Sequence, residues 1–216
     1  MKTFSIILAS LVSWAGITTA QNITVNKTIN GASGPWSWES GGLNTAFQYA
    51  NEYGNFGIQP PTTISATDGF RFSVGDTLTI TYLSGDAEGA YDGTPVNAGG
   101  YLTTPLDNIL AGTYGPGPSY YMNPATYHIY NMEMVGTFAN SSGQIVGTPF
   151  AVGLSGTFTI PAGATQLELG ANDNNYGDNS GSWNIQVTGI PEPTTWSLLT
   201  LGLVTILGGC RMRRRS

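Results

Sequence analysis

Short stretches in which apolar and polar residues alternate recur through the middle of the chain, separated by turns rich in Gly, Asn and Asp. Such a period of two is typical of β-strands with one buried face. Thr77–Tyr82 is a clear case, because it follows a turn signal at Gly75-Asp76. The predicted strands are 70–74, 77–82, 128–138, 150–160, 166–169 and 182–187. Since this region lacks the 3.6-residue period of a helix, we expect a single all-β domain, a β-sandwich or jelly roll, with 99–124 as a long connection.

The composition agrees with this fold class. The chain has 30 Gly and only 9% charged residues, a mixture suited to short strands joined by Gly- and Asn-rich turns. Its 11% aromatic residues provide apolar area for a core, which argues against disorder. The span 21–190, about 170 residues, fits one domain. The single cysteine, Cys210, excludes an intrachain disulfide.

The N-terminus has the pattern of a secretory signal peptide. Lys2 precedes an apolar run from Phe4 to Val12, and Thr18-Thr19-Ala20 is a suitable cleavage site before Gln21. An uncleaved membrane anchor is the alternative, but the apolar run is shorter than the roughly 20 residues that a span requires. We therefore expect residues 1–20 to be removed on export.

The C-terminus also consists of targeting elements. Pro191-Glu192-Pro193 ends the last strand and is followed by an apolar stretch, 196–209. This stretch is short for a transmembrane helix but suffices with Trp196 at one interface and arginines at the other. The arginines are Arg211, Arg213, Arg214 and Arg215. Because arginines after an apolar segment stay cytoplasmic, the domain is expected outside.

These three parts, in this order over residues 191–216, resemble the PEP-CTERM sorting signal of Gram-negative bacteria. The resemblance implies processing near the PEP triplet by an exosortase, a membrane cysteine protease. It also implies a precursor anchored in the inner membrane and a product at the cell surface or in an extracellular polysaccharide matrix.

The charge is distributed unevenly. Between Gln21 and Ile190 the only cations are Lys27 and Arg71, against twelve Asp and Glu, which gives 2 − 12 = −10. A domain this acidic repels phosphate backbones, so nucleic-acid binding is excluded as a function class. The same charge suits a divalent cation.

The segment 172–183, Asn-Asp-Asn-Asn-Tyr-Gly-Asp-Asn-Ser-Gly-Ser-Trp, is the strongest candidate for chemistry. It lies between two predicted strands as a hairpin-like loop with two carboxylates and four carboxamides. Calcium prefers six to eight such oxygen ligands. The alternative is an ordinary exposed turn, because Asn, Asp and Gly favour turn geometry by themselves.

This loop resembles the calcium loop of galactophilic bacterial lectins of the PA-IL type, small jelly-roll proteins in which a bound calcium holds a sugar. Asn172-Asp173 matches their Asn-Asp pair, and 176–183 matches their Tyr-Gly-Asn-Asn-Ser-Gly-Ser-aromatic run. The good match covers 164–187. Two departures stand out: the turn before Tyr176 is two residues shorter, and Asp178 replaces an Asn.

The resemblance implies a ligand set for Ca²⁺. Asp173, Asp178 and Asn179 would supply side-chain oxygens, and Asn175 its backbone carbonyl. A further carbonyl is expected from a loop after an early strand, for which Tyr91 is our candidate. Asn174, inside the turn, is a candidate sugar contact.

Sugar recognition has fewer candidates. Those lectins use a His and a Gln from another loop, whereas the only histidine here, His128, lies in a predicted strand, so galactose specificity does not carry over. Trp36 and Trp38 lie on one side of an extended segment and are either a sugar-stacking platform or core residues, the commoner use.

No catalytic constellation accompanies these residues. The chain has no nucleophile–base pair, and no stretch nominates the paired carboxylates of a glycoside hydrolase. The sequence therefore predicts a non-enzymatic, calcium-dependent carbohydrate-binding module. The alternatives are a matrix protein with a calcium-stapled loop and no sugar site and, less favoured, a surface glycoside hydrolase.

Overall fold

A computed structural model describes residues 22–37, 44, 57–89, 94–101, 129–173 and 175–190 of the chain. These residues form nine β-strands and two short 3₁₀-helices, η1 (Ala66–Asp68) and η3 (Tyr176–Asp178), and none of them is α-helical. The strands belong to one compact unit, Gln21–Glu192.

The larger of two antiparallel sheets has β9 at its centre. Its strands follow the order β1-β9-β3-β7, and the short β4 pairs with the start of β9. The bounds are Ile23–Asn30 for β1, Thr77–Ser84 for β3, Ala87–Glu88 for β4, Ser155–Thr159 for β7 and Ser180–Ile190 for β9. Because Ile23 is opposite Gly189 in the β1–β9 register, both ends of the described domain lie at the same end of this sheet.

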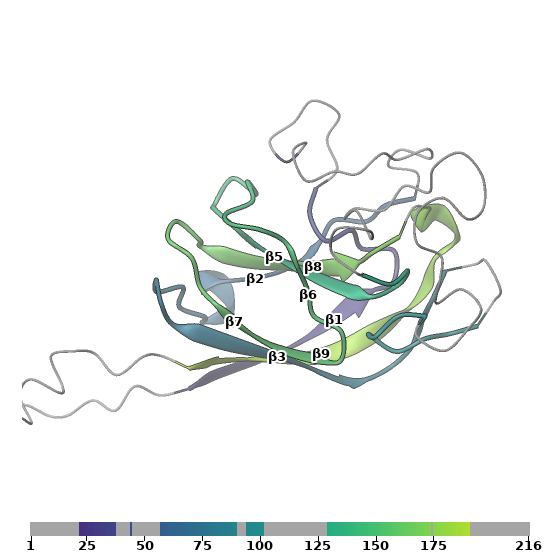
Figure 1. Ribbon diagram of the computed structural model, residues 1–216, viewed down its shortest axis with the longest axis horizontal. Helices are drawn as coiled ribbons and strands as arrows, with labels where there is room; N and C mark the ends of the chain where they lie inside the picture. Colours follow the sequence, from purple (N-terminus) through teal and green to yellow (C-terminus); the bar gives the residue numbers. More distant parts are fainter. Residues whose placement is uncertain are drawn as a thin grey trace, which may run out of the picture. The chain divides into compact units, whose positions relative to one another are not determined.

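The second sheet has four strands in the order β2-β8-β5-β6. The bounds are Thr62–Ser65 for β2, Met134–Ala139 for β5, Phe150–Ala151 for β6 and Gln166–Ala171 for β8. Figure 1 shows β5 and β8 in one layer above β3 and β9 in the other. The prediction of an all-β, sandwich-like fold is thereby confirmed.

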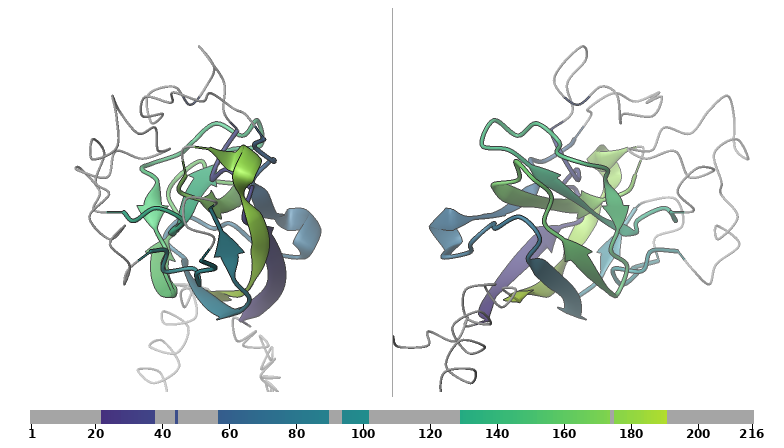
Figure 2. Two further views of the ribbon diagram at one scale, coloured as in Figure 1. Left: turned by 90° about the vertical axis from the view of Figure 1, so that its right-hand side faces the viewer. Right: turned by 60° about the vertical axis from the view of Figure 1, so that its left-hand side comes forward.

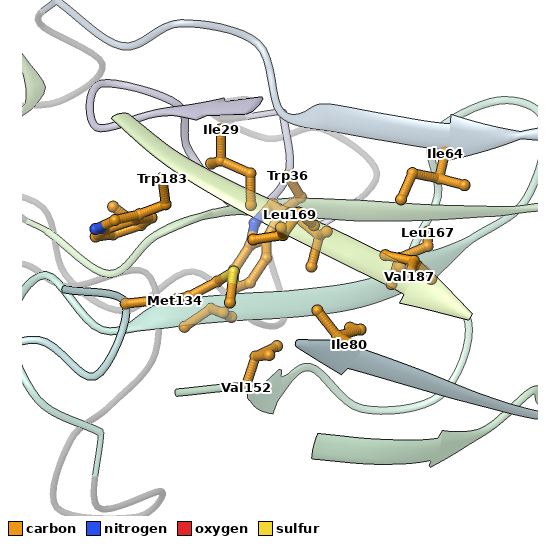
Figure 3. Packing of buried hydrophobic residues seen from close by; sticks show 14 of the residues in the cluster. Ile29, Trp36, Ile64, Ile80, Met134, Val152, Leu167, Leu169, Trp183 and Val187 are labelled. Carbon is orange, nitrogen blue, oxygen red and sulfur yellow. The ribbon is translucent and has the colours of Figure 1, made fainter. Parts of the chain in front are cut away.

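The core lies between the two sheets. Ile80 on β3 and Val187 on β9 are completely buried and pack in one cluster with Leu167 and Leu169 of β8 (Figure 3). Trp183 closes the cluster near the start of β9, where its Nε1 donates to the Val96 carbonyl at 3.0 Å. Truncating a buried Trp of this kind costs about 3–5 kcal/mol, so Trp183 is a major contributor to the core.

Three of the predicted strands are confirmed: 77–82, 166–169 and 182–187 lie within β3, β8 and β9. The prediction of one strand over 150–160 is wrong. The chain turns at Gly153, which has φ of 57°, so that β6 pairs with β5 whereas β7 pairs with β3 in the other sheet.

Two further strand predictions need correction. Residues 70–74 alternate in polarity but form no ladder; Phe70 and Phe72 pack against each other at 5.1 Å between ring centroids. In 128–138 the described part becomes a strand only at Met134, because Met132 adopts a left-handed φ of 57°. Conversely, β1 and β2 were not predicted, although β1 alternates along its length.

Several predictions fall outside the described residues: the signal peptide 1–20, the sorting segment 191–216 with its PEP triplet and arginines, His128, and most of the 99–124 connection. In the part of the chain that the structure describes, no helix is long and apolar enough to cross a membrane.

One buried carboxyl group makes the stability of this domain depend on pH. Glu168 on β8 is only 3% exposed and lies directly opposite Thr137 of β5. Its Oε1 accepts from Gln166 at 2.7 Å, but its Oε2 and the hydroxyl of Thr137 have no hydrogen-bond partner. Burial therefore raises the pKa of Glu168 from 4.5 to about 7.

We expect Glu168→Gln to reduce the pH dependence of stability, to which Glu133, with a pKa raised by burial to about 6, also contributes. The folded state holds the proton of Glu168 more tightly than the unfolded state, so the contribution of this group to the free energy of unfolding should fall by about 3 kcal/mol as the pH rises from 4.5 through about 7. Urea unfolding at a series of pH values measures this fall. Glu88→Gln, at a half-buried position on β4, is the control, and an equally steep fall in the Glu168→Gln variant would contradict the assignment.

Candidate functional site

The candidate calcium loop, 172–179, connects strands of different sheets. It leaves β8 in the four-stranded sheet and enters β9 in the five-stranded sheet, so it is an arch over one end of the sandwich and not the predicted hairpin. In Figure 1 its 3₁₀-helix η3 lies at the right, whereas β9 ends at the left.

Asn172 attaches the start of the arch to the segment before β5. Its backbone N–H donates to the Glu133 carbonyl at 2.9 Å and its carbonyl accepts from the Met132 N–H at 2.8 Å. Its Nδ2 also donates to the Tyr130 carbonyl at 3.2 Å. The side chain of Asn172 is therefore used for positioning, and it is completely buried.

Tyr176 connects the middle of the arch to its start through the hydroxyl group of its side chain. Its ring is buried and its hydroxyl donates to the Ala171 carbonyl at 2.6 Å. The same hydroxyl accepts from the backbone N–H of Asp173 at 3.3 Å. Asp173 itself is only 3% exposed, so the structure places this predicted ligand beneath the loop surface.

Asn175 and Asp178 are the two predicted ligands that contact each other. Asn175 caps η3, with its Oδ1 accepting from the Gly177 N–H at 3.1 Å, and its Nδ2 donates to Asp178 Oδ2 at 3.0 Å. Asp178 is exposed, yet partial desolvation raises its pKa, opposed by a hydrogen bond from its own backbone. Two carboxylates of the loop are thus held at different depths.

The side chain of Asn179 contacts a different part of the domain, the residue that directly follows β1. Its Nδ2 donates to the Gly31 carbonyl at 2.9 Å, which fixes the orientation of the amide because a carbonyl accepts only from the NH₂ group. The Oδ1 atom is consequently turned inward, where it is buried and has no hydrogen-bond partner. It faces Gly89: a Cβ added there would lie 3.3 Å from this oxygen.

The described cations lie elsewhere. Lys27 is 2.6 Å from Asp68, with which it forms an ion pair. Arg71 follows Phe70, whose ring packs against Gly189 at the opposite end of β9. The arch therefore presents acceptor oxygens in a region without a nearby Lys or Arg from the described part.

These oxygens match the donor class of calcium. Among the described residues, no group of three or more His, Cys, Asp or Glu side chains is arranged to hold a metal ion. The predicted set has only two carboxylates, and amide and carbonyl oxygens make up the rest, as Ca²⁺ tolerates. The buried Oδ1 of Asn179 is the atom for which a cation would supply the missing partner.

Other predicted site residues have different outcomes. Trp36 is completely buried in the core, so its assignment to a sugar-stacking platform is wrong and the core alternative holds. Trp38, Tyr91 and Asn174 lie outside the described residues. Gly89, two residues before Tyr91 in the sequence, lies against Asn179.

Sequence reasoning missed the segment that supports the arch from the other side. Met132 is fully buried, and its left-handed φ is unusual for a residue with a long side chain. The Oδ1 of the preceding Asn131 is also buried without a partner. Nothing in the sequence around Asn131 signals this conformation, which is accompanied by a hydrogen bond of 2.8 Å from the Met132 N–H to the carbonyl of Asn172, a residue distant in the sequence.

Comparison with known proteins leaves the family open: no protein-family model matches the chain, and no curated protein is significantly similar to it.

We expect Tyr176→Phe to destabilise the arch by about 1–3 kcal/mol, because the buried Ala171 carbonyl loses its 2.6 Å hydrogen bond and the Asp173 N–H its acceptor. Urea unfolding measures the change. Tyr130→Phe, at a 38% exposed tyrosine, serves as the matched control. Equal stability of the Tyr176→Phe variant and the wild type would show that the hydroxyl does not hold the loop.

Proposed function

We propose that this chain is an exported bacterial surface or matrix protein whose β-sandwich is a non-catalytic module that binds Ca²⁺ at the β8–β9 arch and carbohydrate through that ion. The observation that carries the proposal is the buried Oδ1 of Asn179, which has no partner while its amide is fixed by Gly31. An unsatisfied buried acceptor costs about 1–3 kcal/mol, and a bound cation offsets that cost.

The carboxylates of the arch support the same proposal. Asp173 and Asp178 would balance the two charges of the ion, and the raised pKa of Asp178 shows that its negative charge is stabilised less than in water. A cation beside it would lower that pKa again. Calcium bound at the rim of a domain can retain open positions for sugar hydroxyls, which is the role that the lectin resemblance implies.

The placement of the arch suits a protein anchored through its C-terminus. Strand β9 runs for 11 residues from the arch to Ile190, a length of about 35 Å. Since β1 begins beside the end of β9, Ile23 and Ile190 lie at the end of this sheet opposite the arch.

The export route is part of the proposal. The signal peptide pattern, the PEP triplet, the apolar stretch and the terminal arginines support translocation, anchoring of the precursor in the inner membrane and processing by an exosortase. Release at the cell surface or into a polysaccharide matrix would place the arch among its ligands.

A structural role without a sugar site is the second candidate. The bonds from Asn175 to Asp178 and from Asn179 to Gly31 show that the arch already holds much of its own shape. In this case calcium only staples the arch, and the module serves as a building block of the matrix.

Calcium should raise the melting temperature of residues 21–192, the compact unit that contains all the described strands and core, because a ligand that binds only the folded state stabilises it. At a calcium concentration 100 times Kd the free energy of unfolding increases by about 2.7 kcal/mol, and Asp173→Asn should abolish this increase. Asp86→Asn removes an exposed carboxylate outside the arch and should leave the gain intact. Thermal unfolding with calcium and with EDTA decides; no shift in the wild type would refute both calcium hypotheses.

A glycan array separates the two roles of calcium. The carbohydrate-binding hypothesis predicts signals that appear with calcium and vanish with EDTA or with Asp173→Asn. A silent array, together with a calcium-dependent rise in melting temperature, would favour the structural role.

Replacing Pro191, Glu192 and Pro193 with alanines should block processing of the exported chain, so that the precursor accumulates in the inner membrane. Immunoblotting of membrane and secreted fractions measures this accumulation. Replacement of Thr194 and Thr195 by alanines is the control. Normal maturation of the PEP variant would argue against an exosortase.

A further inference from the structure

The outer face of the five-stranded sheet is polar and uncharged. Val25, Ile185 and Ile80 point into the core, so their neighbours along the strands point outward. The outward positions of β1, β9, β3 and β7 are all occupied by Thr, Ser, Asn or Gln. They are every second residue from 24 to 30, from 182 to 188, from 77 to 81 and from 155 to 159. We call this surface the polar face, and it carries no Asp, Glu, Lys or Arg.

The side chains of the polar face are linked across the strands. Between β1 and β9, Thr24 and Thr188 share a hydroxyl–hydroxyl bond of 3.2 Å, and Gln186 Nε2 donates to Asn26 Oδ1 at 3.3 Å. Between β3 and β7, the hydroxyls of Thr79 and Thr157 are 3.0 Å apart. Each linked group keeps further donor or acceptor capacity, because a hydroxyl has one hydrogen and two lone pairs. The result is an ordered array in which side chains are held in place before any partner arrives.

The spacing of this array is set by the sheet. Outward residues recur about every 6.7 Å along a strand and about every 4.8 Å across strands. Asn26, Thr28 and Thr157 are exposed, so their free capacity is available to a partner. Hydroxyl and carboxamide groups at such intervals match a partner that is itself covered with hydroxyls.

We propose that the polar face is a calcium-independent docking surface for a neutral, hydroxyl-rich polysaccharide. Charge supports this partner: the segment 21–190 has a net charge of −10, which repels acidic polymers, whereas the polar face provides a neutral area on that molecule. Because the described polar face lacks aromatic side chains, binding would rest on many weak hydrogen bonds, which a repetitive polymer engages together.

The shape of the sheet favours a flexible chain over a flat solid or a second copy of the protein. Adjacent strands turn by about 20–25°, so the array rotates by about 60–75° from β1 to β7. The views in Figure 2 show this twist in β9 and β3. A planar surface would touch only part of the polar face, and two copies have few apolar atoms within it to bury, because the exposed apolar residues Leu83, Leu154 and Ile190 lie at its borders.

Affinity electrophoresis tests the proposal on the mature protein, purified after export from cells that produce the full chain. Native gels contain excess EDTA and either hydroxyethylcellulose, a neutral glucan derivative, or alginate, an acidic polysaccharide. We expect the neutral glucan alone to retard the wild type. Gln186→Glu introduces a charge without a change of shape and Thr79→Val removes one hydroxyl, so each should weaken the affinity about two- to ten-fold. Thr148→Val, an exposed position between β5 and β6, should have no effect.

The outcomes separate this proposal from the calcium site. Asp173→Asn should keep full retardation in EDTA, and Gln186→Glu should keep any calcium-dependent rise in melting temperature. The proposal is overturned if the wild type is not retarded in EDTA, if alginate retards it as strongly as the glucan, or if Gln186→Glu and Thr79→Val bind like the wild type. A dimer in light scattering that Gln186→Glu dissociates, without retardation, would assign the polar face to self-association instead.

Discussion

Strand β9 is the constraint on which the rest of the molecule depends. It pairs with β1 along one edge and with β3 and β4 along the other, and it contributes Trp183, Ile185 and Val187 to the core. Because its first residue follows the arch and its last precedes the PEP triplet, one strand fixes the positions of the candidate site and of the C-terminal exit. The same strand supplies the central row of the polar face.

The arch shows how a single amide can decide what a loop offers to a ligand. The NH₂ group of Asn179 is committed to the Gly31 carbonyl, so its oxygen must face the interior. A loop of the same composition without this bond would expose the amide to water and would have no need of an ion. The proposed calcium site therefore depends on the hydrogen bond between Asn179 and Gly31, which are distant in the sequence, as much as on the acidic residues of the arch.

Period-two alternation was sufficient to predict β3, β8 and β9, because apolar residues that face the core alternate with other residues along each of these strands. It failed for 70–74, where Phe70 and Phe72 pack together without a partner strand, and for 150–160, where a turn at Gly153 sends two short strands to different sheets. Strand pairing depends on residues far apart in the sequence, so local alternation alone does not predict which strands pair. For the same reason the composition of 172–183 identified the loop but not the depth of Asp173 or the direction of Asn179. Trp36 illustrates the converse, since an exposed platform and a core anchor have the same local pattern.

The antiparallel pairing of β1 with β9 also determines how the domain would respond to mechanical load. Were the chain tethered beyond Ile190 while a ligand held the arch, tension would run lengthwise through β9. The rungs of its ladders lie perpendicular to that direction, so they would be sheared together and not peeled open one at a time. Tension between the two chain termini would instead unzip β1 from β9 starting at Ile23. This pairing would resist tension applied between the arch and Ile190 better than tension applied between the two ends of the domain.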